Sequence, residues 1–476
     1  MNSESDYAML IDGKRVATGQ GTCGVTNPAT GEEIARVPDC SDEQLDEAIA
    51  AARAAFPAWS ALDLNERRAR LVAFAEAILA QTAPLARLLT QEQGKPLHEA
   101  EREVMGCAGW LKGVCALDLP EEVNEDNETR LSVTQRVPLG VVGAIVPWNF
   151  PLLLAMFKIG PALVTGNTMV LKPSPFTPLT TLRMAELSRG ILPDGVLNVI
   201  CGEDRLCPAM TAHPGVDKIS FTGSTATGRR VMGSSAATLK RVTLELGGND
   251  AAIVLPDADV ERIAPDLFWA AFRNNGQICI ATKRLYVHRS VYARLKEALV
   301  AYAGTVRLGD GTEQGVGLGP LNNKPQFDRV RDLLEDSRAQ GHSFLFEAAG
   351  DVPANGYFVP VTLIDNPPEE ARIVQEEQFG PVLPILVYED VEEAIARANA
   401  SEYGLGCSIW GTDEEAAAAV AARIQSGTVW INETQYLSPF ASFGGWKQSG
   451  VGTEGGREGL VEYTVPRTIV RRRASA

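Results

Sequence analysis

GVVGAIVPWNFP, residues 140–151, joins a continuous apolar run to a loop that holds one asparagine between two prolines. A run without polar–apolar alternation is typical of a parallel strand covered on both faces. Similar runs occupy residues 168–172, 196–200, 218–222, 242–246 and 251–255, with helix-length stretches between most of them, and a second series occupies residues 284–288, 384–388 and 428–432. This order predicts a two-sheet α/β protein. Residues 128–138 alternate polar and apolar side chains, and they and residues 462–470 predict additional antiparallel strands.

Helix-start signals support the same architecture. Ser41 and Gln44 have the spacing of a capping box and precede apolar residues at helical intervals. Thr412 and Glu415 predict a second helix start, and Gly427 predicts the end of that helix.

The composition limits the classes of protein to consider. At 476 residues, with 45% hydrophobic and 22% charged residues, the chain is expected to be globular and to form at least two domains. Its net charge of −16 argues against binding to nucleic acid or anionic lipid. The first residues lack the pattern of a signal peptide, and the apolar runs are too short to span a bilayer. The eight cysteines show no paired spacing, so we expect reduced thiols in the cytoplasm and neither disulfides nor a metal site.

One cysteine has an unusual setting. In FRNNGQICIATKR, residues 272–284, Cys279 lies among amides and small residues. Either it is a buried structural thiol, or it is a nucleophile that needs local activation. The chain has only four histidines, none in a motif-like setting, so a Cys–His hydrolase is the less favoured alternative.

Three other segments have the features of a reactive site. Asn149, fixed between prolines after a strand, is either a turn residue or an amide that donates to an oxyanion. Glu245 lies inside an apolar strand, where burial would raise its pKa towards that of a general base unless the carboxylate is structural. Gly223 and Ser224 lie between a strand and a helix, where free backbone N–H groups can bind phosphate, although this motif alone is a weak signal.

Taken in order along nearly the whole chain, seven motifs resemble those of the aldehyde dehydrogenase superfamily. They are PWNFP, KPSPFTP, FTGSTATG, LELGG, GQIC, EEQFGPVLP and FGGWKQSG. The resemblance implies two doubly wound parallel-sheet domains plus a small antiparallel oligomerisation sheet. The expected division is residues 1–116 and 138–245 for the cofactor-binding domain, 246–445 for the catalytic domain, and 117–137 and 446–476 for the oligomerisation segments. A homodimer or homotetramer is expected on the same basis.

The resemblance also implies catalytic roles. Cys279 would attack the aldehyde carbonyl, and the oxyanion would be held by the side-chain amide of Asn149 and the backbone N–H of Cys279. Hydride transfer would then leave a thioester, which water activated by Glu245 would hydrolyse to the carboxylic acid.

A nicotinamide dinucleotide is the implied cofactor. The residues that match the family's cofactor contacts are Ile145, Trp148, Lys172, Ser174, Gly223, Ser224, Glu377 and Phe379. Many members of the family carry a glutamate three residues after the lysine, where it binds the ribose 2′-hydroxyl and repels a 2′-phosphate. This chain has Pro175 there. We expect NAD, because no basic residue adjoins Ser174 in the sequence, and NADP use is the alternative.

The substrate is expected to be a medium-chain aliphatic or aromatic aldehyde. The residues that match the family's aldehyde channel are Phe150, Leu154, Phe157, Ile278 and Ile280, with residues 433–443 at its mouth. This lining is apolar and shows no extra cation in the sequence.

Three other functions are alternatives. In a CoA-acylating aldehyde dehydrogenase, the thiol of CoA would take the acyl group in place of water. Glu245 in LELGG favours hydrolysis and therefore argues against this alternative. A cofactor-free thioesterase or esterase could use Cys279 alone. A structural protein with this fold would not need Cys279, which the intact motifs make the least favoured alternative.

Overall fold

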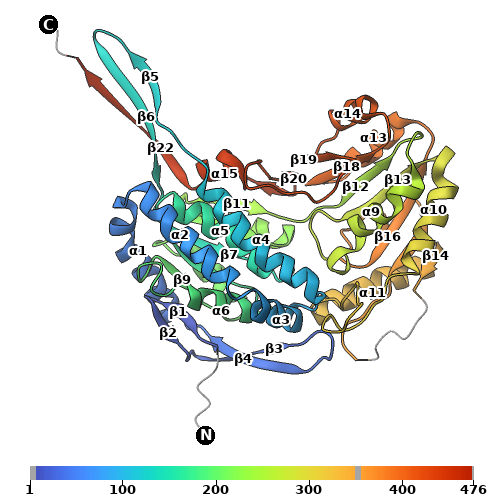
Figure 1. Ribbon diagram of the computed structural model, residues 1–476, viewed down its shortest axis with the longest axis horizontal. Helices are drawn as coiled ribbons and strands as arrows, with labels where there is room; N and C mark the ends of the chain where they lie inside the picture. Colours follow the sequence, from blue (N-terminus) through green and yellow to red (C-terminus); the bar gives the residue numbers. More distant parts are fainter. Residues whose placement is uncertain (1–6, 349–354, 474–476) are drawn as a thin grey trace.

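The computed structural model describes residues 7–348 and 355–473, and it contains two large sheets and a projecting arm (Figure 1). The eight-stranded sheet has the order β2-β1-β9-β8-β7-β10-β11-β21. Its strands are β1 (Met9–Ile11), β2 (Lys14–Val16), β7 (Val141–Ile145), β8 (Thr168–Lys172), β9 (Leu197–Val199), β10 (Lys218–Thr222), β11 (Arg241–Glu245) and β21 (Gly450–Val451). The strands from β9 to β11 are parallel, whereas β1, β2 and β21 pair antiparallel at the two edges.

Helices pack on this first sheet and share one apolar core with it. They are α1 (Asp42–Ala61), α2 (Leu64–Leu79), α3 (Thr82–Gln93), α4 (Leu97–Cys115), α5 (Pro151–Val164), α6 (Leu179–Leu187), α7 (Leu206–Ala212) and α8 (Thr225–Ser235), followed by the short helix η1 (Ala236–Thr238). The predicted capping box is confirmed, because Ser41 Oγ accepts from the N–H of Gln44 and the Gln44 side chain accepts from the N–H of Ser41.

The seven-stranded sheet has the order β14-β15-β16-β13-β12-β18-β19 and is parallel except for β14. Its strands are β12 (Asp250–Val254), β13 (Thr282–His288), β14 (Ser343–Glu347), β15 (Thr362–Asp365), β16 (Val382–Tyr388), β18 (Gly406–Trp410) and β19 (Thr428–Ile431). Ala251 and Ile253 pack into one apolar core, and Ala252 and Val254 pack into another. Both faces of the sheet are therefore covered, as the continuous apolar run predicts.

The helices of this second half are α9 (Val260–Phe272), η2 (Arg273–Gly276), α10 (Arg289–Ala303), α11 (Lys324–Ala339), α12 (Arg372–Gln375), α13 (Val391–Asn399) and α14 (Glu414–Ala421). The predicted limits of the last helix are wrong at both ends. Asp413 caps it by accepting from the N–H groups of Glu415 and Ala416, whereas the Thr412 side chain bonds to Asp257. The helix ends at Ala421, and Gly427 directly precedes β19.

The arm is the three-stranded antiparallel sheet β22-β6-β5, which extends away from the body (Figure 1). It comprises β5 (Glu122–Asp126), β6 (Arg130–Pro138) and β22 (Thr464–Arg472). The predicted oligomerisation segment 446–476 is divided in the structure: β20 (Trp446–Lys447) pairs with β17 (Tyr403–Gly404), β21 joins the first sheet, α15 (Gly456–Val461) contacts α5, and only β22 enters the arm. A hairpin of β3 (Gly21–Thr26) and β4 (Glu33–Asp39) completes the fold.

Within the described residues, no single helix is both long and apolar enough to cross a membrane; α2 and α3, bent by 70° at their junction, pass that test of length and composition only as a pair.

Candidate functional site

A groove lies at the carboxyl ends of the parallel strands of the first sheet. β7 and β10 pair side by side, with Ile145 opposite Phe221, so the loops that follow both strands leave the same edge of the sheet. These loops contribute Pro147, Trp148, Gly223 and Ser224 to two adjoining compartments. We call them the thiol compartment, with a volume of about 390 Å³, and the outer compartment, with a volume of about 360 Å³.

The thiol compartment brings Cys279 and Asn149 together. Asn149 Nδ2 donates to the carbonyl oxygen of Gln277 at 2.9 Å, and Asn274 Nδ2 donates to the Asn149 carbonyl oxygen at 3.0 Å. The PWNFP loop and the cysteine loop are thus bonded to each other in both directions. Asn149 is 4% exposed, and one of its two amide hydrogens remains free to point at a substrate oxygen.

The cysteine loop adopts a backbone that few residues tolerate. Asn274, Asn275 and Gly276 have φ of 49°, 56° and 74°, in the left-handed region. A side chain at Gly276 would meet the carbonyl oxygen of Gly380 at 2.2 Å. Asparagine and glycine are the residues that adopt this conformation at the lowest cost, which accounts for the NNG sequence before the thiol.

Charged groups surround the Cys279 thiol. Lys283 Nζ donates to the carbonyl oxygens of Ile278, at 2.9 Å, and Cys279, at 2.6 Å, and lies 3.5 Å from Glu377 Oε1. The pKa of Cys279 is raised to about 12, mainly by burial; Lys283 opposes this shift, and Glu245, Asp250 and Glu377 contribute to it. The thiol of the free protein therefore stays protonated at neutral pH and needs added positive charge to ionise.

Glu245 ends β11 beneath this compartment. It is 4% exposed, its Oε1 has no hydrogen-bond partner among the described residues, and the neighbouring Leu246 and Gly247 line the compartment. Its pKa is raised well above the usual range, first by burial and then by Glu454, while Lys158 lowers it. A carboxyl group with a raised pKa next to a thiol is suited to proton transfer.

Lys158 and Glu454 form a fully buried ion pair beside Glu245. Sequence reasoning missed both residues. Lys158 had a usable signal, since it is the only charged residue of α5, PLLLAMFKIGPALV, in which almost every side chain is buried. Glu454 had none, because it lies in a glycine-rich stretch between β21 and α15.

The predicted dinucleotide contacts occupy three places. Trp148, Gly223, Ser224, Glu377 and Phe379 line the thiol compartment. Ser174 lines the outer compartment. Ile145 and Lys172 are opposite each other on β7 and β8 and lie beneath the groove surface, at 5% and 1% exposure.

The predicted substrate residues also separate into groups. Leu154 lines the thiol compartment, and Phe150, Ile278 and Ile280 pack with Cys279 in one apolar cluster. Phe157 instead lies in the core, 2% exposed, where its ring stacks on Trp110 at a centroid distance of 3.7 Å.

A cation that the sequence did not reveal lies behind this lining. Lys95 Nζ is 3.7 Å from the centroid of the Phe150 ring, donates to the Asn149 carbonyl oxygen at 2.8 Å and pairs with Glu103; both partners of this pair are fully buried. The other oxygen of Glu103 accepts from the N–H groups of Leu152 and Leu153 at the start of α5. The pair therefore fixes the PWNFP loop from behind and carries no net charge into the channel.

We predict that Lys95→Met lowers the thermal unfolding midpoint by several degrees. Removing one partner of a buried ion pair costs about 3–5 kcal/mol, because the other charge stays buried. Lys112→Met is the matched control, since its pair with Glu76 is exposed and such pairs contribute about 0–1 kcal/mol. Scanning calorimetry of both variants checks this, and equal midpoints would contradict the assigned role of Lys95.

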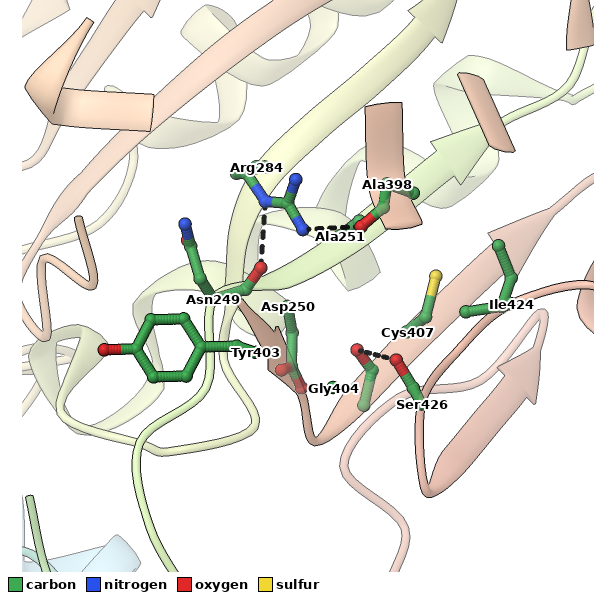
Figure 2. Close-up of a pocket in the computed structure, with 11 residues that line it drawn as sticks. Asn249, Asp250, Ala251, Arg284, Ala398, Tyr403, Gly404, Cys407, Ile424 and Ser426 are labelled. Carbon is green, nitrogen blue, oxygen red and sulfur yellow. Dashed lines mark hydrogen bonds between the residues drawn. The ribbon is translucent and has the colours of Figure 1, made fainter. Parts of the chain in front are cut away.

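A second, much smaller cavity lies behind the segment that follows Glu245 (Figure 2). Arg284 Nε donates to the Asn249 carbonyl oxygen at 2.9 Å, and the Asn249 side-chain amide donates to the carbonyl oxygens of Val374 and Gln375. Asn249 thereby connects the LELGG segment to the loop that presents Glu377. The cavity's volume of about 10 Å³ suits one water molecule.

No group of three or more His, Cys, Asp or Glu side chains able to hold a metal ion occurs within residues 7–348 and 355–473.

Comparison with known proteins identifies extensive similarity. A family model described as "Aldehyde dehydrogenase family" matches residues 16–469. The chain is 43% identical to a "Probable aldehyde dehydrogenase" of Pseudomonas sp, over 99% of this chain and 96% of the relative. It is 40% identical to the phenylacetaldehyde dehydrogenase of Pseudomonas fluorescens, over 98% and 95% of the two chains. Among solved structures, betaine aldehyde dehydrogenase of Staphylococcus aureus in complex with NAD+ is 34% identical and superposes with a TM-score of 0.95 over 99% of this chain and 96% of that chain.

Proposed function

Because the chain belongs to the aldehyde dehydrogenase family, we propose that it oxidises an aldehyde to the carboxylic acid through a thioester on Cys279, with NAD as electron acceptor. The single observation that carries this proposal is the thiol compartment, in which Cys279 and the Asn149 amide line one cavity that shares wall residues with the outer compartment.

The groove has the features that a dinucleotide requires. Ser224 caps α8, so the free N–H groups of the first turn face the groove and suit a pyrophosphate. The Glu377 carboxylate faces the thiol compartment, and Gly247 leaves it room, because a side chain at Gly247 would meet Glu377 Oε2 at 2.4 Å. Trp148 and Phe379 meet edge-on at 5.3 Å beside the thiol and would hold the nicotinamide. When bound, NAD supplies positive charge beside the sulfur and takes up the hydride that leaves the substrate carbon.

The chain's own residues carry the rest of the reaction. Cys279 loses its thiol proton to solvent, and Sγ forms a bond to the carbonyl carbon. The electron pair of the C=O bond moves to the oxygen, where Asn149 Nδ2 and the Cys279 N–H stabilise the negative charge. Loss of hydride from that carbon leaves a thioester. Glu245 then takes a proton from water, hydroxide adds to the thioester carbon, and the carbon–sulfur bond breaks to release the acid.

We predict that Asn149→Ala lowers kcat by about 10²–10³, the usual effect of removing one oxyanion donor. KM and the dissociation constant of NAD are expected to change much less, because the amide acts on charge that develops during the reaction. Steady-state kinetics together with calorimetric titration of NAD checks this. A variant with normal kcat would assign Asn149 to loop structure alone.

The apolar cluster around Cys279 supports medium-chain aliphatic or aromatic aldehydes as substrates. The similarity to a phenylacetaldehyde dehydrogenase points to the same class. The reaction is tested by measuring the absorbance of reduced nicotinamide as it forms from aldehyde and NAD, with no CoA in the assay. A panel of benzaldehyde, hexanal and succinic semialdehyde tests the substrate class, and preference for succinic semialdehyde in kcat/KM would contradict it.

The arm supports the proposal of a homodimer or homotetramer. Its strands expose Val123, Ile469 and Val470 at 63%, 48% and 61%. Val123 and Ile469 lie in one row across the sheet, on either side of Val133, and Val470 lies on the opposite face. Exposed apolar side chains on a projecting sheet are typical of a subunit contact. Light scattering on the purified protein measures the oligomer, and a monomer at micromolar concentration would contradict this assignment.

A further inference from the structure

The outer compartment contains a carboxylate that the sequence motifs did not reveal. Its lining includes Ser174 and Pro175, where a family glutamate is absent, and also Asp204. Among the described residues that line this compartment, Asp204 and Arg230 are the only ones with charged side chains. A bound dinucleotide would therefore lie near one negative and one positive side chain, and the positions of these two side chains determine which of them lies beside the adenosine ribose.

The order of strands places Asp204 on the same side as Lys172. Lys172 ends β8, and Asp204 lies in the loop after β9, the strand that pairs directly with β8. Arg230 belongs to α8, which follows β10, and β7 separates β10 from β8 in the sheet. Asp204 therefore flanks the Lys172 side of the groove, and Arg230 flanks the opposite side.

Hydrogen-bonding groups on that side are uncommitted. The Asp204 carboxylate has no hydrogen bond or ion pair within the described residues, although the adjacent Arg205 is bonded to Asp39, Asp42 and the Cys40 carbonyl oxygen. Lys172 is 1% exposed, and among the described residues its Nζ makes one long hydrogen bond, 3.4 Å to the carbonyl oxygen of Pro173. A buried ammonium without a good acceptor and a free carboxylate together suit the two hydroxyl groups of a ribose.

We propose that Asp204 makes this enzyme selective for NAD over NADP, by accepting a hydrogen bond from the 2′-hydroxyl of the adenosine ribose and repelling a 2′-phosphate. This inference rests on the proposed function, since it concerns the cofactor of the same reaction. Asp204 supplies from the loop after β9 the carboxylate that Pro175 cannot supply from the loop after β8. Repulsion between a carboxylate and an adjacent 2′-phosphate disfavours NADP and leaves NAD unaffected, so it discriminates between the two dinucleotides.

Arg230 is the residue that opposes this assignment. One of its N–H groups donates to Thr227 Oγ1 at 2.9 Å, on its own helix. From the far side of the groove, its planar guanidinium is suited to stack on the adenine ring. If it reached the 2′ position instead, NADP would be the tighter ligand.

The test is calorimetric titration of the full-length enzyme with NAD and with NADP, without aldehyde. We expect NAD to bind the wild type at least about 30-fold more tightly than NADP. Asp204→Asn is expected to lower this ratio of affinities by about tenfold or more, because it weakens the binding of NAD and strengthens the binding of NADP. Glu203→Gln is the matched control, because it removes the same charge from the adjacent residue, which does not line the compartment, and it is expected to leave the ratio unchanged.

Two further variants separate the remaining outcomes. Arg230→Gln is expected to weaken both dinucleotides by a similar factor, and Arg229→Gln, whose side chain bonds Gln448 outside the groove, is expected to weaken neither. Three results would each overturn the inference. The wild type could bind NAD and NADP with equal affinity, Asp204→Asn could leave the ratio of the two affinities unchanged, or Arg230→Gln could weaken the binding of NADP alone. Absence of binding by both dinucleotides would instead overturn the proposed function.

Discussion

Replacing Cys279 with alanine is expected to lower kcat/KM for aldehyde oxidation by a factor on the order of 10⁵, as removal of a covalent nucleophile does in other enzymes. Only a thiol can form a thioester, and Cys279 is the only cysteine among the described residues that line the thiol compartment. Initial rates over a range of aldehyde concentrations provide the measurement.

The control for this variant is Cys23→Ala, which removes a half-buried thiol of β3 that lines neither compartment. That variant is expected to keep wild-type activity. The Cys279→Ala enzyme is expected to bind NAD normally, which would show that the fold is intact. Residual oxidation above about one per cent of wild type would contradict a covalent mechanism on this thiol.

Glu245→Gln is expected to lower steady-state turnover by about 10²–10⁴ while it leaves the first turnover intact. Glutamine cannot take a proton from water, so the thioester forms and then accumulates. A rapid burst of reduced nicotinamide, close to one equivalent per active site, should therefore precede a slow steady state. Stopped-flow absorbance checks this, and loss of the burst together with turnover would assign Glu245 to an earlier step.

The pH dependence of the wild type provides a second test of Glu245. Its pKa is raised by burial, then by Glu454, and is lowered by Lys158. Only the ionised carboxylate is a base, so hydrolysis should increase with pH until the pH exceeds this raised pKa. The acid side of the kcat profile should thus lie above the usual range of carboxyl groups, and the slow steady state of Glu245→Gln should lack that limb.

Much of the parallel-sheet architecture could be predicted from the sequence, because continuous apolar runs are costly anywhere but in covered strands. β8 and β10 have the predicted limits, and β7 and β12 differ from prediction by about one residue. The sequence did not reveal the four N-terminal strands, three strands of the second sheet, one strand of the arm or three two-residue strands. These are β1, β2, β3 and β4; β14, β15 and β18; β5; and β17, β20 and β21. β18, GCSIW, mixes small and polar residues, and its place in the sheet is set by pairing with β12 and β19.

The sequence could indicate those residues of the candidate site that lie in local motifs. Cys279, Asn149, Gly223 and Glu377 come from separate motifs, and the structure places all of them on one compartment. Residues that act through long-range contacts gave no such signal. Lys95 reaches the Asn149 carbonyl oxygen across 54 positions in the chain, because α3, α4 and α5 pack together.

The charged residues of the outer compartment likewise could not be found from the sequence. The sequence has no basic residue beside Ser174, yet the structure brings Arg230 to the same compartment from a different helix, together with Asp204. Similarly, Phe157 lies three positions after Leu154 on α5 but contacts Trp110 of α4 instead of the groove. Which face of a helix meets a cavity depends on its packing partners, and the spacing of its own residues does not specify them.

The most direct test of the account is mass spectrometry of the Glu245→Gln enzyme after brief reaction with hexanal and NAD and rapid acid quenching. The account predicts an acyl group on the peptide that contains Cys279, and no such adduct when NAD is omitted. An unmodified Cys279 peptide during the burst, or an acyl group on a different residue, would contradict it.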